Sequence, residues 1–170
     1  MQRFNKIFGS LIVMSALVTN VNAQATASAS ASATIVTPIS IAKDVDMNFG
    51  NIAVTSSGGT VILATAGTRT TTGGVTLPVV NGTVTAAQFT VSGEGAYTYD
   101  ITLPSSAVTL TKSGGGATMN ATSFNHNAGT PQLSSGSQVF KVGATLTVAA
   151  AQVAGAYTTG TAFNVIVNYN

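Results

Sequence analysis

Short runs of β-prone residues, separated by clusters of glycine and serine, limit most strongly what this chain can fold into. Such clusters include residues 56–59, Asn81-Gly82 and residues 114–116. The runs between them are rich in valine and threonine, and only residues 149–153 have a composition that suits a helix. Many short strands at this spacing are typical of an antiparallel β-sandwich, so we expect an all-β fold.

Turn residues mark the ends of the expected strands. The dipeptide Asn81-Gly82 ends one of them and predicts a tight hairpin. Pro38 lies within the first ordered strand, which predicts an edge strand or a β-bulge because proline has no amide hydrogen to donate. After that first strand, the expected strands are residues 44–54, 60–66, 75–80, 86–92, 97–103, 108–111, 117–124, 139–148 and 163–170.

The segment from Gln24 to Ala33 alternates alanine with serine or threonine. An extended chain places alternate side chains on one face, so the segment has strand periodicity and no helical stripe. We interpret it as an N-terminal extension that adds to a sheet, either of a neighbouring subunit or of its own chain; a disordered tail is the alternative. The side chains expected on its apolar face are Ala25, Ala27, Ala29, Ala31, Ala33 and Ile35.

The last residues of the chain have the same alternation with larger side chains. Phe163, Val165, Val167 and Tyr169 occupy every second position. This pattern predicts a final strand with one buried face. Together with the apolar face of the extension, these four residues are the ones that we expect to function in assembly.

Residues 1–23 have the features of an export signal. Arg3 and Lys6 give a positive start, and residues 7–18 are apolar but too few for a stable membrane span. Ala23 supplies a small residue for cleavage. We therefore expect a cleaved signal peptide; a retained signal anchor is the alternative.

Removal of the signal changes the charge balance. The whole sequence has six basic and four acidic residues, and Arg3 and Lys6 leave with the signal. The mature chain is then formally neutral, so it has no basic patch for nucleic acid or anionic lipid. Its surface must be solvated by hydroxyl and amide groups or covered by neighbours. The absence of cysteine excludes thiol chemistry and a disulfide scaffold.

Few residues are candidates for catalysis. One histidine and no cysteine exclude a Cys-His pair and a three-histidine metal site. No Gly-x-Ser-x-Gly elbow supports a serine nucleophile, and nothing places Glu94 and Asp100 across a sugar. We expect His126 to lie in a surface loop. The sequence thus predicts a protein that is not an enzyme and uses no cofactor.

Asp44, Asp46 and Asn48 share one face of an expected strand and superficially resemble the start of a calcium loop. An EF-hand requires glycine at the sixth position and glutamate at the twelfth, where this chain has Phe49 and Thr55. An EF-hand is excluded. A looser calcium site at the two aspartates stays open, although a solvated face is the simpler interpretation.

Five segments of the chain together resemble a known family. They are residues 38–41, 47–52, 89–93, 143–146 and 165–169. The chain is similar to the domain of unknown function 4402 family over nearly all of its mature length. The resemblance implies an exported bacterial protein with an immunoglobulin-like β-sandwich, similar to spore-coat-U-like domains and, more distantly, to chaperone–usher pilus subunits. Tyr169 holds the place of the aromatic residue that periplasmic chaperones grip in pilus subunits.

We expect a secreted structural or adhesive surface protein, with an extension over residues 24–33 and a sandwich over residues 34–170. Its most specific form is a fimbrial or pilus subunit that assembles by strand addition. The alternative is a soluble extracellular binding module, for example for carbohydrate, with Tyr157, Asn125 and His126 as contacts. Expected partners are further copies of the chain, a periplasmic chaperone and an outer-membrane assembly protein. The expected location is the periplasm, the outer surface or a fibre of a Gram-negative bacterium.

Overall fold

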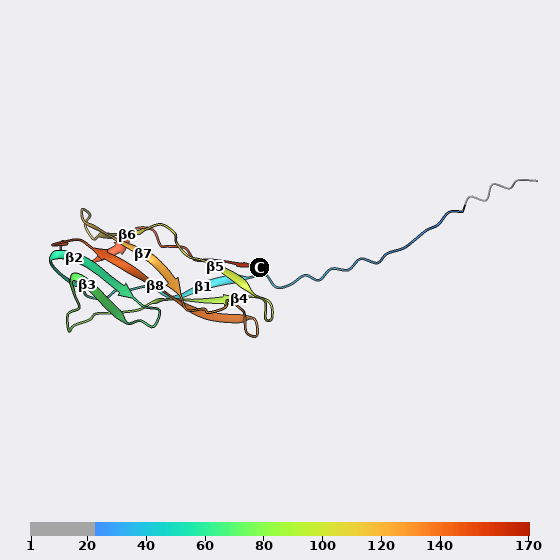
Figure 1. Ribbon diagram of the computed structural model, residues 1–170, viewed down its shortest axis with the longest axis horizontal. Helices are drawn as coiled ribbons and strands as arrows, with labels where there is room; N and C mark the ends of the chain where they lie inside the picture. Colours follow the sequence, from blue (N-terminus) through green and yellow to red (C-terminus); the bar gives the residue numbers. More distant parts are fainter. Residues whose placement is uncertain (1–22) are drawn as a thin grey trace, which may run out of the picture. The chain divides into compact units, whose positions relative to one another are not determined.

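The computed structural model describes residues 23–170 in two units. The described part of the first unit, residues 23–34, is exposed throughout and contains no strand. The second unit, Ile35–Asn170, contains all the strands (Figure 1). The expected signal peptide lies outside the described residues except for Ala23.

Ten strands build the second unit, and every pairing between them is antiparallel. They are β1 (Ser40–Val45), β2 (Ala53–Leu63), β3 (Arg69–Thr76), β4 (Ala87–Ser92), β5 (Tyr99–Thr102), β6 (Val108–Lys112), β7 (Thr118–His126), β8 (Ser137–Val148), β9 (Tyr157–Thr159) and β10 (Ile166–Tyr169). Residues 149–153 form a turn rather than a helix, and Ala151 has a φ of 48°. Over residues 23–170, no helix is long and apolar enough to cross a membrane.

The long strand β8 connects the parts of the larger sheet, whose order is β1-β4-β8-β7-β6-β9 (Figure 1). Along one edge β8 pairs first with β4 and then with β2, which also carries β3; along its other edge it pairs with β7. Gly143 lies where the partner changes, and a Cβ there would collide with the carbonyl of Leu63. Strands β5 and β10 pair separately as a two-stranded sheet.

Alternate residues of β8 supply both hydrophobic clusters of the core. Phe140 and Val142 pack in one cluster, and Ala144, Leu146 and Val148 pack in the other. The first cluster also contains Ala87, Phe89, Val91, Tyr99, Leu133 and Val167. The second also contains Phe49, Val61, Leu63, Val75 and Ala121. One period-2 strand thus anchors two cores that face different sets of neighbours.

The outer face of the larger sheet carries a row of uncharged polar side chains. Thr72, Thr60, Thr147, Asn120 and Thr109 stand opposite one another across β3, β2, β8, β7 and β6. The hydroxyls of Thr60 and Thr72 are 2.7 Å apart, and the Thr109 hydroxyl donates to Asn120 Oδ1 at 3.0 Å. We call these five residues the threonine row.

The predicted all-β, antiparallel sandwich is confirmed. Five expected strands match the observed ones to within two residues at each end: residues 86–92, 97–103, 108–111, 117–124 and 139–148 correspond to β4, β5, β6, β7 and β8. These strands have buried neighbours, which preserve the alternation that the sequence displays. The first strand, β1, is an edge strand with a bulge between Lys43 and Val45, as Pro38 predicted, although Pro38 itself precedes it.

Other expected strands were wrong in extent or connection. Residues 44–54 do not form one strand, because the chain leaves β1 at Val45 and enters β2 only at Ala53. Asn81-Gly82 is not a hairpin turn, since β3 and β4 do not pair; the hairpin in this region joins β2 to β3. Residues 75–80 leave the sheet after Thr76, and Val79 is 98% exposed. The short strand β9 had no sequence signal.

Replacement of Leu146 by alanine tests whether β8 anchors the core. Leu146 is 1% exposed, so Leu146→Ala should lower the free energy of unfolding by about 3 kcal/mol through lost burial and a residual cavity. Thr147→Ala, its outward-facing neighbour, should change it by about 0.5 kcal/mol or less. Chemical denaturation of both variants measures the difference, and equal losses would show that Leu146 is not a core anchor.

Candidate functional site

An open groove lies between two irregular stretches of the second unit, residues 45–54 and residues 153–165. The cavity measures about 1250 Å³. Apolar side chains from both core clusters and their neighbours form its floor: Phe89, Leu110, Met119, Phe124, Leu146 and Val148. We call it the open groove. Phe89, Leu146 and Val148 are buried at its base, whereas Leu110, Met119 and Phe124 are only partly buried and leave apolar surface accessible in the groove.

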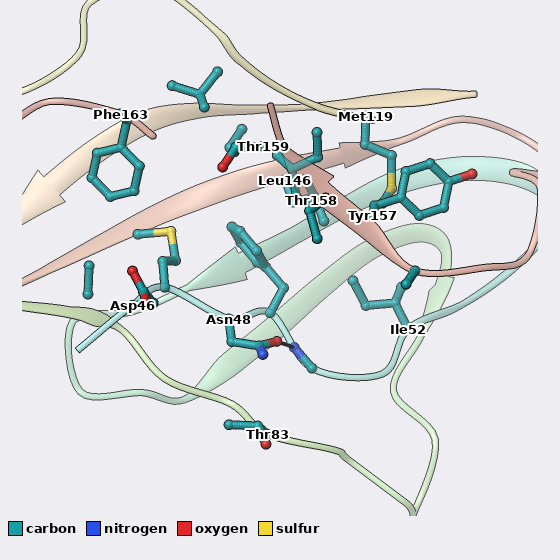
Figure 2. A pocket seen from close by; sticks show the side chains of 18 of the residues that line it. Asp46, Asn48, Ile52, Thr83, Met119, Leu146, Tyr157, Thr158, Thr159 and Phe163 are labelled. Atoms are coloured by element: carbon teal, nitrogen blue, oxygen red, sulfur yellow. Dashed lines mark hydrogen bonds between the residues drawn. The ribbon is translucent and has the colours of Figure 1, made fainter. Parts of the chain in front are cut away.

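The side chains of the open groove come from opposite walls (Figure 2). Phe163, Met119 and Tyr157 lie along one side, and Asn48 and Ile52 lie along the other. At its rim, the ammonium of Lys43 and a carboxylate oxygen of Asp46 form an ion pair at 2.7 Å. The lining otherwise consists of neutral residues. Such a groove favours an extended, uncharged and partly apolar occupant.

The first wall, residues 45–54, is held from outside the groove. Asn48 exchanges backbone hydrogen bonds with Thr85, and its side chain accepts from the amide of Gly50 at 2.8 Å. The guanidinium of Arg69 donates to the carbonyls of Phe49 and Asn51, the latter at 2.8 Å. Several backbone polar groups of this wall, those of Asn48 and the carbonyls of Phe49 and Asn51 among them, are thus bonded without a strand ladder, where the predicted strand over residues 44–54 is interrupted.

The second wall contains an unpaired stretch of backbone at residues 160–165. Among the described residues, none donates or accepts a hydrogen bond with these six, through either backbone or side chain. Phe163 and Val165 nevertheless line the groove and are half-buried, whereas Asn164 between them is exposed. The alternation of a strand is therefore present where no neighbouring strand is.

The predicted strand over residues 163–170 is correspondingly too long, since β10 starts only at Ile166. Its partner β5 ends at Thr102, which pairs with Ile166. Pro104 follows shortly afterwards and has no amide hydrogen to continue the ladder. Residues 160–165 thus extend beyond the available sheet. The sequence has the alternation of a strand here, but no described strand pairs with residues 160–165.

The expected assembly residues of the C-terminal segment separate into three environments. Phe163 and Val165 face the open groove, and Val167 is 8% exposed in the core cluster of Phe140. Tyr169 instead joins a set of hydrogen bonds near the start of β1. The residues expected on the apolar face of the extension, Ala25, Ala27, Ala29, Ala31 and Ala33, are exposed and outside any strand, and Ile35 is 97% exposed.

Thr37, Glu94 and Tyr169 form a connected cluster, which we call the Thr37 latch. The amide and hydroxyl of Thr37 donate to Glu94 Oε2 at 3.0 and 2.7 Å. The Tyr169 hydroxyl donates to the Thr37 carbonyl at 2.9 Å and accepts from the Glu94 amide at 2.6 Å. These residues are far apart in sequence, and no local pattern could have revealed the cluster.

Hydrogen bonding within the Thr37 latch affects the charge of Glu94. The Thr37 hydroxyl, and then the Thr37 amide, lower the pKa of Glu94 from its ordinary value of 4.5 because both stabilise the carboxylate. The slight burial of the group acts in the opposite direction. The ionised latch is therefore the form that prevails near neutral pH.

The residues of the expected carbohydrate site do not gather around one pocket. Tyr157 lines the open groove, and its hydroxyl donates to the Val153 carbonyl at 2.6 Å. Asn125 and His126 lie at the end of β7 and do not line that groove. The expectation of a surface-loop histidine was wrong: His126 is half-buried in the strand, and its ring packs edge-on against Phe140.

Asp44 and Asp46, the two aspartates of the looser calcium site that the sequence left open, both have hydrogen-bonding or ion-pair partners within the protein. Asp44 Oδ2 accepts from the Thr90 hydroxyl at 2.7 Å, and Asp46 pairs with Lys43. In the described part of the chain, no three histidine, cysteine or acidic residues cluster as metal ligands would.

Comparison with known proteins adds one finding. Residues 39–169 match the family model described as Domain of unknown function (DUF4402). No curated protein and no solved structure shows significant similarity to the chain. The match spans both walls of the open groove, β1 and β10, and it begins after Thr37.

The Thr37 latch predicts a specific pH dependence of stability. Because the pKa of Glu94 is lower in the folded than in the unfolded chain, its contribution is fully present above the unfolded value and is lost as pH falls through the folded value. Between about pH 5 and about pH 3, the melting temperature of the wild type should therefore fall more than that of Glu94→Gln. The other carboxylates are common to both proteins, so identical pH profiles would contradict this role of Glu94.

Proposed function

We propose that this chain, which belongs to the domain of unknown function 4402 family, is a structural subunit of an exported fibre whose copies join by strand addition. The observation that carries the proposal is the unpaired edge at residues 160–165, beside the open groove. Backbone amides and carbonyls at a sheet edge bind an incoming extended segment, and alternate side chains fill the adjacent groove. No catalytic step is needed for this function.

The occupant that suits the open groove best is the extension of a second copy. Residues 25–35 carry no charge, and the groove lining is neutral apart from the Lys43–Asp46 pair. Extended, these eleven residues span about 36 Å at roughly 3.3 Å each. Their alanine methyls would face the apolar floor while their hydroxyls stay in water. Methyl groups add only modest burial, so the backbone ladder contributes much of the affinity.

Such an interface connects different surfaces of the two copies. Each copy supplies one donor segment and one acceptor groove, which makes the contact heterologous. Heterologous contacts that do not close into a ring produce open filaments. A fibre therefore follows from the same two features that identify the site. This argument favours the fibre over a soluble carbohydrate-binding module, whose expected residues do not converge.

The proposal also includes export of the chain and a partner protein that binds the subunit before assembly. A signal peptide over residues 1–23 would deliver the chain to the periplasm, in agreement with the absence of cysteine and the neutral mature composition. An apolar groove left open before assembly favours aggregation. A periplasmic chaperone that covers the groove, and an outer-membrane protein that exchanges it for the next subunit, fit this requirement. A polar soluble protein would need neither.

Two neighbouring substitutions in the extension test strand addition. Ala29→Asp places a carboxylate in the middle of the methyl face, where insertion would bury an unpaired charge at a cost of several kcal/mol. It should abolish polymers while the sandwich stays folded. Ser30→Asp puts the same charge on the opposite face, so its polymers should resemble those of the wild type.

Electron microscopy and SDS-resistant ladders on gels report the polymers, and circular dichroism reports the fold. The matched pair separates the insertion of one face from a general effect of negative charge. If both variants polymerise equally, or if the wild type remains monomeric after export and removal of any chaperone, the extension does not act as a donor strand.

A further inference from the structure

The Thr37 latch fixes the backbone of Thr37 at the start of the sandwich. Both backbone groups of Thr37 are engaged: its amide donates to Glu94, and its carbonyl accepts from Tyr169. The next residue, Pro38, has no amide hydrogen. A β-turn centred on Thr37 and Pro38 would form its own hydrogen bond between the Val36 carbonyl and the Ile39 amide. A reversal there would nevertheless re-orient the amide and carbonyl of Thr37, and so break their bonds to Glu94 and Tyr169.

The sequence before the latch favours an extended segment over a tight reversal. Residues 24–36 contain no glycine, proline, asparagine or aspartate, and their only turn-prone residues are the three serines of the alternating pattern. They alternate as a single extended segment up to Ile35. An intrachain insertion would require this segment to turn back and enter the groove beside β1. Thr37-Pro38 is the first proline-containing dipeptide after this segment, and the latch holds Thr37 in place.

The latch is built on a rigid support. Gly93 donates its amide to the Gly136 carbonyl at 2.9 Å, and Gly136 donates to the Gly95 carbonyl at 2.7 Å. At Gly93 a Cβ would collide with the Tyr169 hydroxyl, so this position admits only glycine without displacing the latch. The ring of Tyr97 packs against that of Tyr169 with centroids 5.6 Å apart. The geometry of Thr37 is therefore set by packing as well as by hydrogen bonds.

We infer that the Thr37 latch prevents the extension from filling the groove of its own chain and so directs strand addition to a second copy. This inference rests on the proposed function, because it concerns whether the extension enters the groove of its own chain or that of a second copy. Thr37, Glu94 and Tyr169 are positioning residues, since none of them lines the groove. The latch thus determines which partner the site takes, while the groove determines which segment fits.

The test uses variants in which the latch is broken and the groove is intact. Tyr169→Phe removes the hydroxyl that bonds to Thr37 but keeps the ring. Glu94→Ala removes the carboxylate from an exposed position, and it provides a second route to the same state. Tyr97→Phe is the matched control, because the Tyr97 hydroxyl makes no hydrogen bond to the described chain and its ring stays in place.

Two readouts on the mature protein separate the possibilities. The first is the monomer fraction by size-exclusion chromatography. The second is binding of a fluorescent peptide with the sequence of residues 24–36 to the monomers. Loss of about one net hydrogen bond should shift the balance toward self-insertion roughly tenfold. We therefore expect Tyr169→Phe and Glu94→Ala to accumulate as monomers that do not bind the peptide. The wild type and Tyr97→Phe should polymerise.

The same peptide, added to a variant lacking residues 24–33, tests the groove independently. This truncated protein should bind the peptide equally well with Tyr169 or Phe at position 169. If it binds and the two latch variants polymerise as the wild type does, or if their monomers still take the peptide, the inference about the latch is wrong and the proposed function stands. If the truncated protein does not bind the peptide in either form, both are wrong.

Discussion

Hydrogen bonding along both edges of β8 is the constraint on which the sandwich depends. One twelve-residue strand pairs with β4, β2 and β7, and its inward side chains belong to both core clusters. Its exchange of partners at Gly143 is possible because no side chain separates it from the carbonyl of Leu63. Each cluster alone would be small, but sharing a strand makes their packing mutually dependent. The two parts of the unit are thereby built as one.

The second wall of the open groove differs from β8, because the backbone of β8 is paired along both edges and that of residues 160–165 is not. Backbone polar groups in folded proteins are almost always paired, and solvent can satisfy those at an exposed edge only while the edge stays exposed. Residues 160–165 hold apolar side chains toward the core and leave their amides and carbonyls without protein partners. In the first wall, by contrast, Arg69 donates to the carbonyls of Phe49 and Asn51. The two walls therefore differ in how far their backbone is hydrogen-bonded to the described protein.

Sequence reasoning identified the fold class and the strands whose alternation matches their burial, such as β4 and β8. It overextended the final strand because periodicity describes the faces of a strand and not whether a neighbour exists. It misplaced the hairpin at Asn81-Gly82 because Asn81 is used instead by Asn51 and Arg69, a tertiary effect. The three residues of β9 are too few for any periodicity.

The candidate site was predictable in part. The apolar alternation at Phe163 and Val165 singled out two residues that do line the open groove, whereas the role expected for the extension stays a prediction. The roles of Arg69 and Glu94 were not predictable, because single charged residues have no local pattern and acquire their partners only when distant segments meet. Cross-sequence contacts of this kind account for most of what was missed.

The threonine row on the outer face has a consequence for how that side of the molecule meets water. Its hydroxyl and amide groups carry no titratable proton between strongly acidic and strongly basic conditions, so pH does not alter their charge. Ionic screening acts on charges, and here it has none to weaken. Hydration of the threonine row is consequently set by neutral hydroxyl and amide groups, and neither pH nor salt changes the charge that this row presents to water.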